Sequence, residues 1–114
     1  MRSEKRDRAY FWDMRQFARG SRRIVHRIAF ARLERDSMRR LALERALELL
    51  GEAARRVSEG AKNEHPGIDW RALIGQRNVL AHDCGEINHR LLYDNVRRKI
   101  PSLLAQLDRI LGEP

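Results

Sequence analysis

The chain has 114 residues, of which 42% are apolar and 35% are charged. This length suits one domain, residues 1–114, and is too short for two ordinary hydrophobic cores. Apolar runs reach only about four residues, whereas a membrane-spanning helix needs about 20, and the N-terminal residues lead into no apolar stretch of the kind found in secretory signals. A single cysteine, Cys84, cannot form an internal disulfide. We therefore expect a cytoplasmic chain without a membrane span.

Positive charge dominates the composition, with a formal net charge of +8 at pH 7 and lysine only at Lys5, Lys62 and Lys99. Such a surplus favours an anionic partner, namely nucleic acid, an acidic protein or a phospholipid surface. Arginine binds phosphate oxygens in a bidentate geometry that lysine does not offer, although an arginine-rich codon usage would give the same ratio. Pairs such as Glu52 and Arg56, at helical spacing, would neutralise part of this surface. The net charge alone does not decide whether the chain binds nucleic acid.

Apolar residues recur every three or four positions from Tyr10 to Ile28, which predicts an amphipathic helix over residues 5–29. Gly20 is a weak point in this helix, because glycine costs about 1 kcal/mol relative to alanine. Residues 30–36 hold few apolar side chains, and we expect them to form a connector with a short turn.

A long second helix is expected to begin at Asp36 or Ser37, either of which can supply a capping oxygen. Its apolar face begins at Met38 and reaches Val57, and Ala61 would extend it.

Residues 63–67 end in Pro-Gly and are the clearest helix breaker in the chain. Asp69 can cap a third helix that has Trp70 in the core, and we expect that helix to end at Gly85.

A fourth helix is expected from Asn88 to Leu111, because leucine, isoleucine and valine keep the helical period there. Pro101 should kink this helix or divide it after Lys99 or Ile100. No segment alternates with the period of two that is typical of strands. The predicted fold is all-α, an antiparallel bundle of four or five helices.

The chain lacks the sequence patterns of common metal and cofactor sites. No pair of histidines has metal-ligand spacing on one helix, and His82, Cys84 and His89 match no known ligand spacing. There is no glycine-rich phosphate loop, nucleophile elbow or paired aspartate cluster. We therefore expect no metal and no cofactor, and we expect His26 and His65 to be surface residues without a special role.

What remains for chemistry is the segment from Arg77 to His82. On a regular helix, five residues advance by about 500°, so these two side chains would point roughly 140° apart. Asn78 and His82 share a face, which Arg77 reaches only through its long stem. A joint site therefore requires that the helix end or distort near His82, as Gly85 would permit, or that a second chain in a twofold dimer supply part of it.

A set of longer segments accompanies this motif in a specific order. They are Leu49-Leu-Gly-Glu-Ala-Ala-Arg-Arg-Val57, then Pro66-Gly-Ile-Asp-Trp70, then Arg77-Asn-Val-Leu-Ala-His82, then Ile100-Pro-Ser-Leu-Leu104. With this set, the chain resembles the HepT-like toxins of the HEPN superfamily from about Asp7 to Leu111.

This resemblance implies an all-helical homodimer in which two Arg-x4-His motifs line one cleft at the interface. It implies a metal-independent endoribonuclease, the toxin of a toxin–antitoxin pair whose antitoxin is a minimal nucleotidyltransferase. Arg77 and His82 would be the catalytic pair, and Asn78 the polar residue that follows the arginine in the motif.

These residue types suit RNA cleavage by the substrate's own 2′-hydroxyl. Imidazole titrates near pH 6.5, so His82 can accept or donate a proton. Arg77 stays protonated and can stabilise the extra negative charge on phosphorus, while Asn78 could orient the phosphate or the imidazole. In a symmetric cleft, one His82 would take a proton and its twin would give one, which is a hypothesis.

The chain departs from the family pattern at Cys84. Many relatives continue the motif as Arg-x4-His-x-Tyr, and the antitoxin attaches AMP to that tyrosine. Tyr93 does not replace it, since it falls where relatives carry a buried aromatic residue. This leaves inhibition by complex formation, or loss of toxicity, as the alternatives. Cys84 itself is either a plain substitution or a nucleophile or redox switch.

Further residues have two interpretations each. Gly51 permits close helix contact, within the chain or across the dimer, and Glu52 pairs with an arginine or faces solvent. The RNA path is expected to follow basic residues on the rim of the cleft, namely Arg55, Arg56, Arg97 and Arg98.

Two other functions compete with the ribonuclease. One is a catalytically idle helical dimer that binds a protein or RNA. The other is a basic DNA-binding bundle, which is disfavoured because no helix-turn-helix pattern is present.

Overall fold

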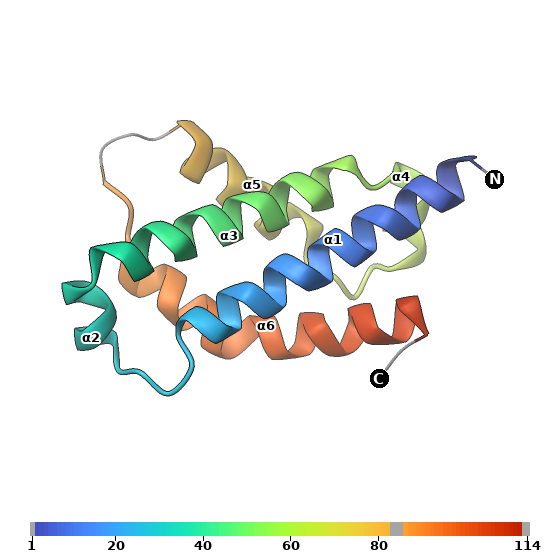
Figure 1. The fold of residues 1–114 in the computed structure, drawn as a ribbon. Coiled ribbons are helices and arrows are strands. Elements are labelled where there is room, and N and C mark those ends of the chain that lie inside the picture. Colours follow the sequence, from blue (N-terminus) through green and yellow to red (C-terminus); the bar gives the residue numbers. More distant parts are fainter. Residues whose placement is uncertain (1, 83–85, 113–114) are drawn as a thin grey trace.

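The computed structural model describes residues 2–82 and 86–112. Within these ranges the chain forms six helices and no strand, which confirms the predicted all-α class (Figure 1). The helices are α1 (Arg2–Ile24), α2 (Phe30–Arg35), α3 (Ser37–Arg56), α4 (Glu59–Glu64), α5 (Trp70–His82) and α6 (His89–Leu111). None of the helices in these ranges is both long enough and apolar enough to cross a membrane.

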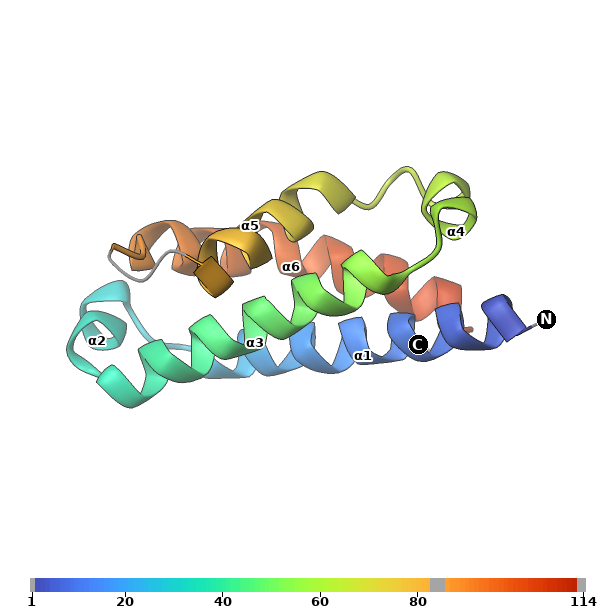
Figure 2. The same ribbon diagram turned by 90° about the horizontal axis from the view of Figure 1, so that it is seen from above.

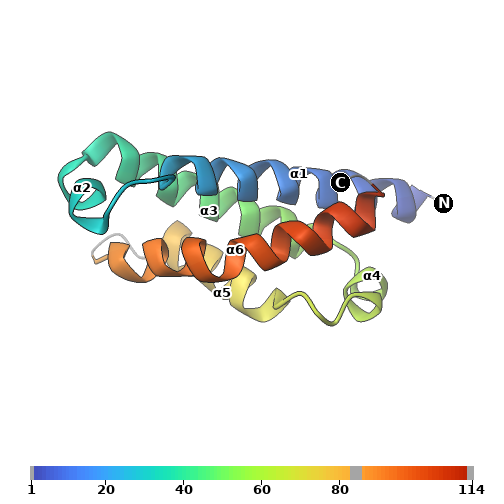
Figure 3. The same ribbon diagram turned by 90° about the horizontal axis from the view of Figure 1, so that it is seen from below.

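The four long helices run alternately up and down, and the short helices α2 and α4 lie at opposite ends of the bundle (Figures 1 and 2). Helix α1 packs against both α3 and α6, whereas α5 packs against α3 (Figure 3). The antiparallel bundle is therefore confirmed. Six helices form over the described residues, rather than four or five, because the connector before α3 holds a short helix and the second predicted helix is divided into α3 and α4.

Apolar side chains from three of the long helices, α1, α3 and α6, meet in the centre of the bundle. Burying one such side chain stabilises the fold by about 1.5–3 kcal/mol. The largest side chains that are fully buried are Met14, Leu33, Leu43, Leu47, Leu50, Val96 and Leu107. The predicted apolar stripe of the last helix is largely the face that packs. The predicted face of the second helix is wrong at its start, because Met38 is 77% exposed, whereas Leu43 and Leu47 are buried.

The first helix is shorter at its C-terminus than predicted. It ends at Ile24 rather than at residue 29, and the chain turns at Arg27, which has a positive φ of 56°. The buried side chain of Val25 anchors this turn to the core. Residues 30–36, predicted as a connector, contain the short helix α2, whose Leu33 is buried.

The second predicted helix is divided in two. Helix α3 is capped by the side chain of Asp36, as expected, but it ends at Arg56. Ser58 then caps α4, which contains Ala61. The carboxylate of Asp7 accepts hydrogen bonds from Ser58 N at 2.9 Å and Ser58 Oγ at 2.6 Å. This contact from α1 fixes the break, because it takes Ser58 N away from the helix ladder.

The last helix is not divided at Pro101. Helix α6 begins where it was predicted, with Asn88 as its cap, and continues without interruption to Leu111. Pro101 is exposed, so the carbonyl group of Arg97, which loses its helical partner, lies on the solvent side. The leucines that follow the proline stay buried and hold the helix against the core.

Candidate active site

Gly51 of α3 and Arg77 of α5 lie where these two helices approach most closely. A Cβ atom at position 51 would lie 2.6 Å from the carbonyl oxygen of Leu73 and would collide with the Cβ atom of Arg77. No side chain fits there. The missing side chain of Gly51 thus makes room for the stem of Arg77, which is the within-chain role that the sequence left open.

Glu52, the next residue on α3, is in contact with three arginines. Its Oε1 atom accepts hydrogen bonds from Arg55 Nη2 at 2.8 Å and Arg56 Nε at 3.0 Å. Its Oε2 atom lies 2.9 Å from Arg77 Nε. The hydrogen bonds from Arg55 and Arg56 lower the pKa of Glu52 from 4.5 to about 2. The carboxylate is therefore ionised throughout the physiological range.

The contact between Glu52 and Arg77 is an ion pair rather than a directed hydrogen bond. The Nε atom of Arg77 is buried, and its N–H does not align with the carboxylate oxygen. Attraction between opposite charges therefore holds the inner edge of this guanidinium. Both side chains are 22% exposed, so water weakens the attraction only in part.

The outer end of Arg77 reaches Asn78. The Nη1 atom of Arg77 donates a hydrogen bond to Asn78 Oδ1 at 3.1 Å. Asn78 is exposed, and on α5 it stands one turn before His82 on the same face. The guanidinium of Arg77 is thereby carried from the α3 side of the helix toward the face of His82.

His82 is the last residue of α5 and is exposed. The helix is continuous from Trp70 to His82, so the angular offset between Arg77 and His82 is that of a regular helix. Over the residues described, no hydrogen bond or ion pair joins these two side chains. One chain therefore presents Arg77 and Asn78 together, with His82 beside them at the helix end.

A sequence comparison identifies the family of this chain. Residues 14–110 match the family model for ribonuclease HepT-like proteins. The chain belongs to the ribonuclease HepT-like family. The family predicted from the ordered segments is confirmed, and with it the class of enzyme, a ribonuclease.

Several archaeal and bacterial proteins are similar to this HepT-like chain. One from Methanocaldococcus jannaschii, named as a candidate RNase, is 29% identical over 105 residues, which cover 91% of this chain and 96% of the relative. A candidate RNase of Caldanaerobacter subterraneus is 29% identical over 76% of this chain and 78% of its own. A protein of Thermococcus cleftensis, named a probable ribonuclease HepT, is 33% identical over 66% of this chain and 68% of its own. No solved structure matches the chain.

The four arginines expected on the RNA path of this HepT-like chain stand at two places. Arg55 and Arg56 lie in the last turn of α3, at the Glu52 carboxylate. Arg97 lies on α6, where it donates to the hydroxyl of Tyr93 at 2.8 Å and stacks over its ring. Arg98 lines the groove between α5 and α6. All four are exposed, but they do not share one contact network within a chain.

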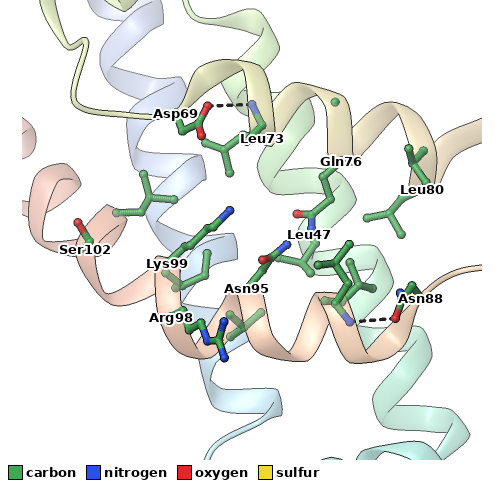
Figure 4. A pocket seen from close by; sticks show the side chains of 18 of the residues that line it. Leu47, Asp69, Leu73, Gln76, Leu80, Asn88, Asn95, Arg98, Lys99 and Ser102 are labelled. Atoms are coloured by element: carbon green, nitrogen blue, oxygen red, sulfur yellow. Dashed lines mark hydrogen bonds between the residues drawn. The ribbon is translucent and has the colours of Figure 1, made fainter.

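An apolar groove of about 590 Å³ separates α5 from α6 (Figure 4). Leu47 of α3 lies at its floor, and Leu73 and Leu80 of α5 line one wall. Two apolar side chains of the groove, Val79 and Leu91, are about half exposed, at 50% and 54%. The helix that carries Arg77 and His82 is therefore flanked by an uncovered apolar surface.

The other histidines of the HepT-like chain have structural surroundings. His65 was expected to be a surface residue without a role, but its ring packs edge-on against Phe11 at 5.5 Å, and its carbonyl accepts from the Trp70 indole. The expectation failed because this contact joins α1 to a loop far away in sequence. His26 is exposed, as expected, and His89 Nε2 lies 2.7 Å from a carboxylate oxygen of Glu44.

Over the described residues, no group of three or more histidine, cysteine, aspartate or glutamate side chains is arranged to hold a metal ion. Cys84, which was predicted to replace the tyrosine of the motif, lies outside the described residues.

Proposed function

We propose that this protein is a metal-independent endoribonuclease, the toxin of a toxin–antitoxin pair, and that it cuts cytoplasmic RNA by attack of the substrate's 2′-hydroxyl. The observation that supports this most directly is the hydrogen bond from Arg77 Nη1 to Asn78 Oδ1. It brings a fixed positive charge to the helix face that also carries His82. A guanidinium, an amide and an imidazole are the residue types that this reaction uses.

In the proposed reaction, His82 removes the proton of the 2′-hydroxyl, and the 2′-oxygen attacks the adjacent phosphorus. The bond from phosphorus to the 5′-oxygen breaks, and that oxygen receives a proton from an imidazolium. The products are a 2′,3′-cyclic phosphate and a 5′-hydroxyl. Arg77 binds the phosphate oxygens whose negative charge increases in the transition state, and Asn78 orients the phosphate or the imidazole.

The acid and the base of this reaction require two imidazoles, and each chain contributes one in the motif. We therefore place the reaction in a cleft between two copies of the chain, where one His82 acts as base and the other as acid. The continuous helix α5 supports this arrangement, because its regular geometry leaves Arg77 and His82 of one chain offset around the helix axis. The phosphates of the RNA would contact Arg55, Arg56, Arg97 and Arg98.

The proposed antitoxin is a minimal nucleotidyltransferase. With cysteine at position 84, the phenolic oxygen that receives AMP in many relatives is missing. We therefore expect inhibition by complex formation, and an antitoxin variant that cannot transfer nucleotides should still neutralise this toxin in growing cells.

Cleavage of RNA in the presence of EDTA tests the activity. Wild-type protein should release fragments that end in a 2′,3′-cyclic phosphate, and Arg77→Ala and His82→Ala should each slow cleavage by about 10²–10⁴-fold. Arg71→Ala and His26→Ala, at exposed positions, are the matched controls and should cleave normally. Cleavage that survives both active-site substitutions would come from another site or a contaminant. RNA binding without cleavage by the wild type would instead support the idle dimer.

A further inference from the structure

The three arginines that surround Glu52 form a cationic cluster with one anion at its centre. We call Glu52, Arg55, Arg56 and Arg77 the Glu52 cluster. Its formal charge is +2, from three guanidinium groups and one carboxylate. Arg55 and Arg56 are about half exposed, whereas Arg77 and Glu52 are both 22% exposed. The anion therefore lies deeper in the protein than two of the three cations that it holds together.

We infer that Glu52 is a positioning residue that holds the guanidinium of Arg77 in the orientation needed at the scissile phosphate. This inference rests on the proposed ribonuclease function. Glu52 touches no substrate in this proposal and acts only through Arg77.

Two contacts fix the orientation of Arg77, one along its stem and one at its guanidinium. Glu52 makes the contact at the guanidinium. The stem of Arg77 lies in the space left by Gly51, which fixes the path of its first carbons. Beyond the stem, the Nε edge faces Glu52 Oε2, and Nη1 donates to Asn78. Because the inner edge is occupied by the carboxylate, the edge formed by the two Nη atoms remains for a phosphate. An arginine in this orientation can meet two phosphate oxygens at once.

Glu52 also prevents the three guanidiniums from repelling each other. Its carboxylate is ionised above about pH 2, the pKa to which the hydrogen bonds of Arg55 and Arg56 lower it. Without this charge, the cluster would change from +2 to +3, and the most mobile cations would separate. Arg77 would lose its inner partner and sample several rotamers, although its stem would stay beside Gly51.

Glu52→Gln separates this role from a purely structural one. The substitution keeps the shape of the side chain and removes only its charge. We expect single-turnover cleavage to become about tenfold slower because Arg77 is less well oriented. We also expect RNA to bind more tightly, by about two- to fivefold at low salt, because the cluster gains a positive charge. Slower cleavage together with tighter binding is not the result of general damage to the fold, which would weaken both.

Glu48→Gln is the matched control, since Glu48 lies one turn earlier on α3, is 27% exposed and pairs only with Arg45 at 3.5 Å among the described residues. It should change neither rate nor affinity by more than about twofold. Binding is measured in the His82→Ala background so that the RNA stays intact. Glu52→Asp, which keeps the charge on a shorter stem, should recover part of the rate lost in Glu52→Gln.

An NMR measurement makes the inference testable without catalysis. The Nε–H resonance of Arg77, assigned by its loss in Arg77→Lys, should exchange slowly with water in the wild type and rapidly in Glu52→Gln. If that resonance is unchanged in Glu52→Gln, or if Glu52→Gln cleaves as fast as the wild type, Glu52 does not position Arg77. A wild type that cuts no RNA while its Arg77 resonance depends on Glu52 would refute the ribonuclease proposal and leave the positioning contact in place.

Discussion

Gly51 and Arg77 occupy complementary positions on two antiparallel helices, the one lacking a side chain where the other needs space for its stem. This relationship couples the packing of α3 against α5 to the placement of Arg77. A change in the spacing of the two helices would move Arg77 relative to Glu52 and Asn78. The packing of α3 against α5 therefore also determines the geometry of the candidate site.

Gly51→Ala tests this coupling. The new methyl group would meet the carbonyl oxygen of Leu73 and the Cβ atom of Arg77, neither of which can rotate away. We expect the free energy of unfolding to fall by about 1–3 kcal/mol, as for other overpacked sites. Chemical denaturation measures the change.

Gly75→Ala is the control for Gly51→Ala. Gly75 lies on α5, and a Cβ atom there meets nothing within 4 Å. That substitution should stabilise the domain by about 0.5–1 kcal/mol, because alanine is the better helix former. If Gly51→Ala stabilised the domain as much as Gly75→Ala does, helix propensity and not the close approach of α5 would determine the effect at position 51.

Local sequence signals predicted the helices and their starts well. Asp36 or Ser37 was expected to cap one helix and Asp69 another, and a further helix was expected to begin near Asn88. Asp36, Asp69 and Asn88 each accept a hydrogen bond from the backbone N–H three residues later. The pair of Glu52 and Arg56 was visible for the same reason, since both residues lie within one turn of a single helix. Such signals depend on neighbours in sequence, so no knowledge of the packing is needed.

Contacts between segments that are distant in the sequence could not be predicted in this way. Asp7 ends the second predicted helix from 51 positions away, and Arg77 approaches Glu52 from another helix. The sequence indicates that Gly51 permits close helix contact and that Glu52 can pair with an arginine, but not which helix packs there. Arg97 and Arg98 look like one basic pair, yet one is held on Tyr93 and the other faces the groove.

Acid should weaken the domain partly through Glu52. The pKa of this carboxyl group is lowered from 4.5 to about 2, mainly by the hydrogen bond from Arg55. A lowered pKa in the folded state means that the carboxylate stabilises the fold above pH 4.5, and that this contribution is lost as the pH falls toward 2. The stability difference between the wild type and Glu52→Gln should therefore shrink over this range. Urea denaturation at several pH values measures it, with Glu48→Gln as the control, and a constant difference would contradict the assignment.

The salt dependence of RNA binding should identify the arginines that meet phosphates. Each lost phosphate contact lowers the slope of log affinity against log salt by about 1. We expect two double variants to have lower slopes than the protein without these substitutions. One combines Arg55→Gln and Arg56→Gln, and the other combines Arg97→Gln and Arg98→Gln. Fluorescence anisotropy in the His82→Ala background gives the slopes. A pair that leaves the slope unchanged does not lie on the RNA path.

Arg22→Gln with Arg23→Gln provides the reference for the salt experiment. Both arginines are exposed near the end of α1. Replacing them also removes two positive charges, so this double variant shows how far the slope depends on net charge alone. A slope that falls equally for all three pairs would mean that RNA responds to the net charge of the domain and not to particular positions.

A substitution in the apolar groove tests whether a second chain completes the site. Val79 follows Asn78 on α5 and is 50% exposed in a single chain. If a partner covers this surface, Val79→Asp places a carboxylate in an apolar interface, which is strongly unfavourable. We expect sedimentation equilibrium to show monomers at concentrations where the wild type is dimeric, together with a loss of RNA cleavage. Met38→Asp is the control, because Met38 is more exposed, at 77%, and lies at the start of α3. A dimeric and active Val79→Asp protein would place the interface elsewhere.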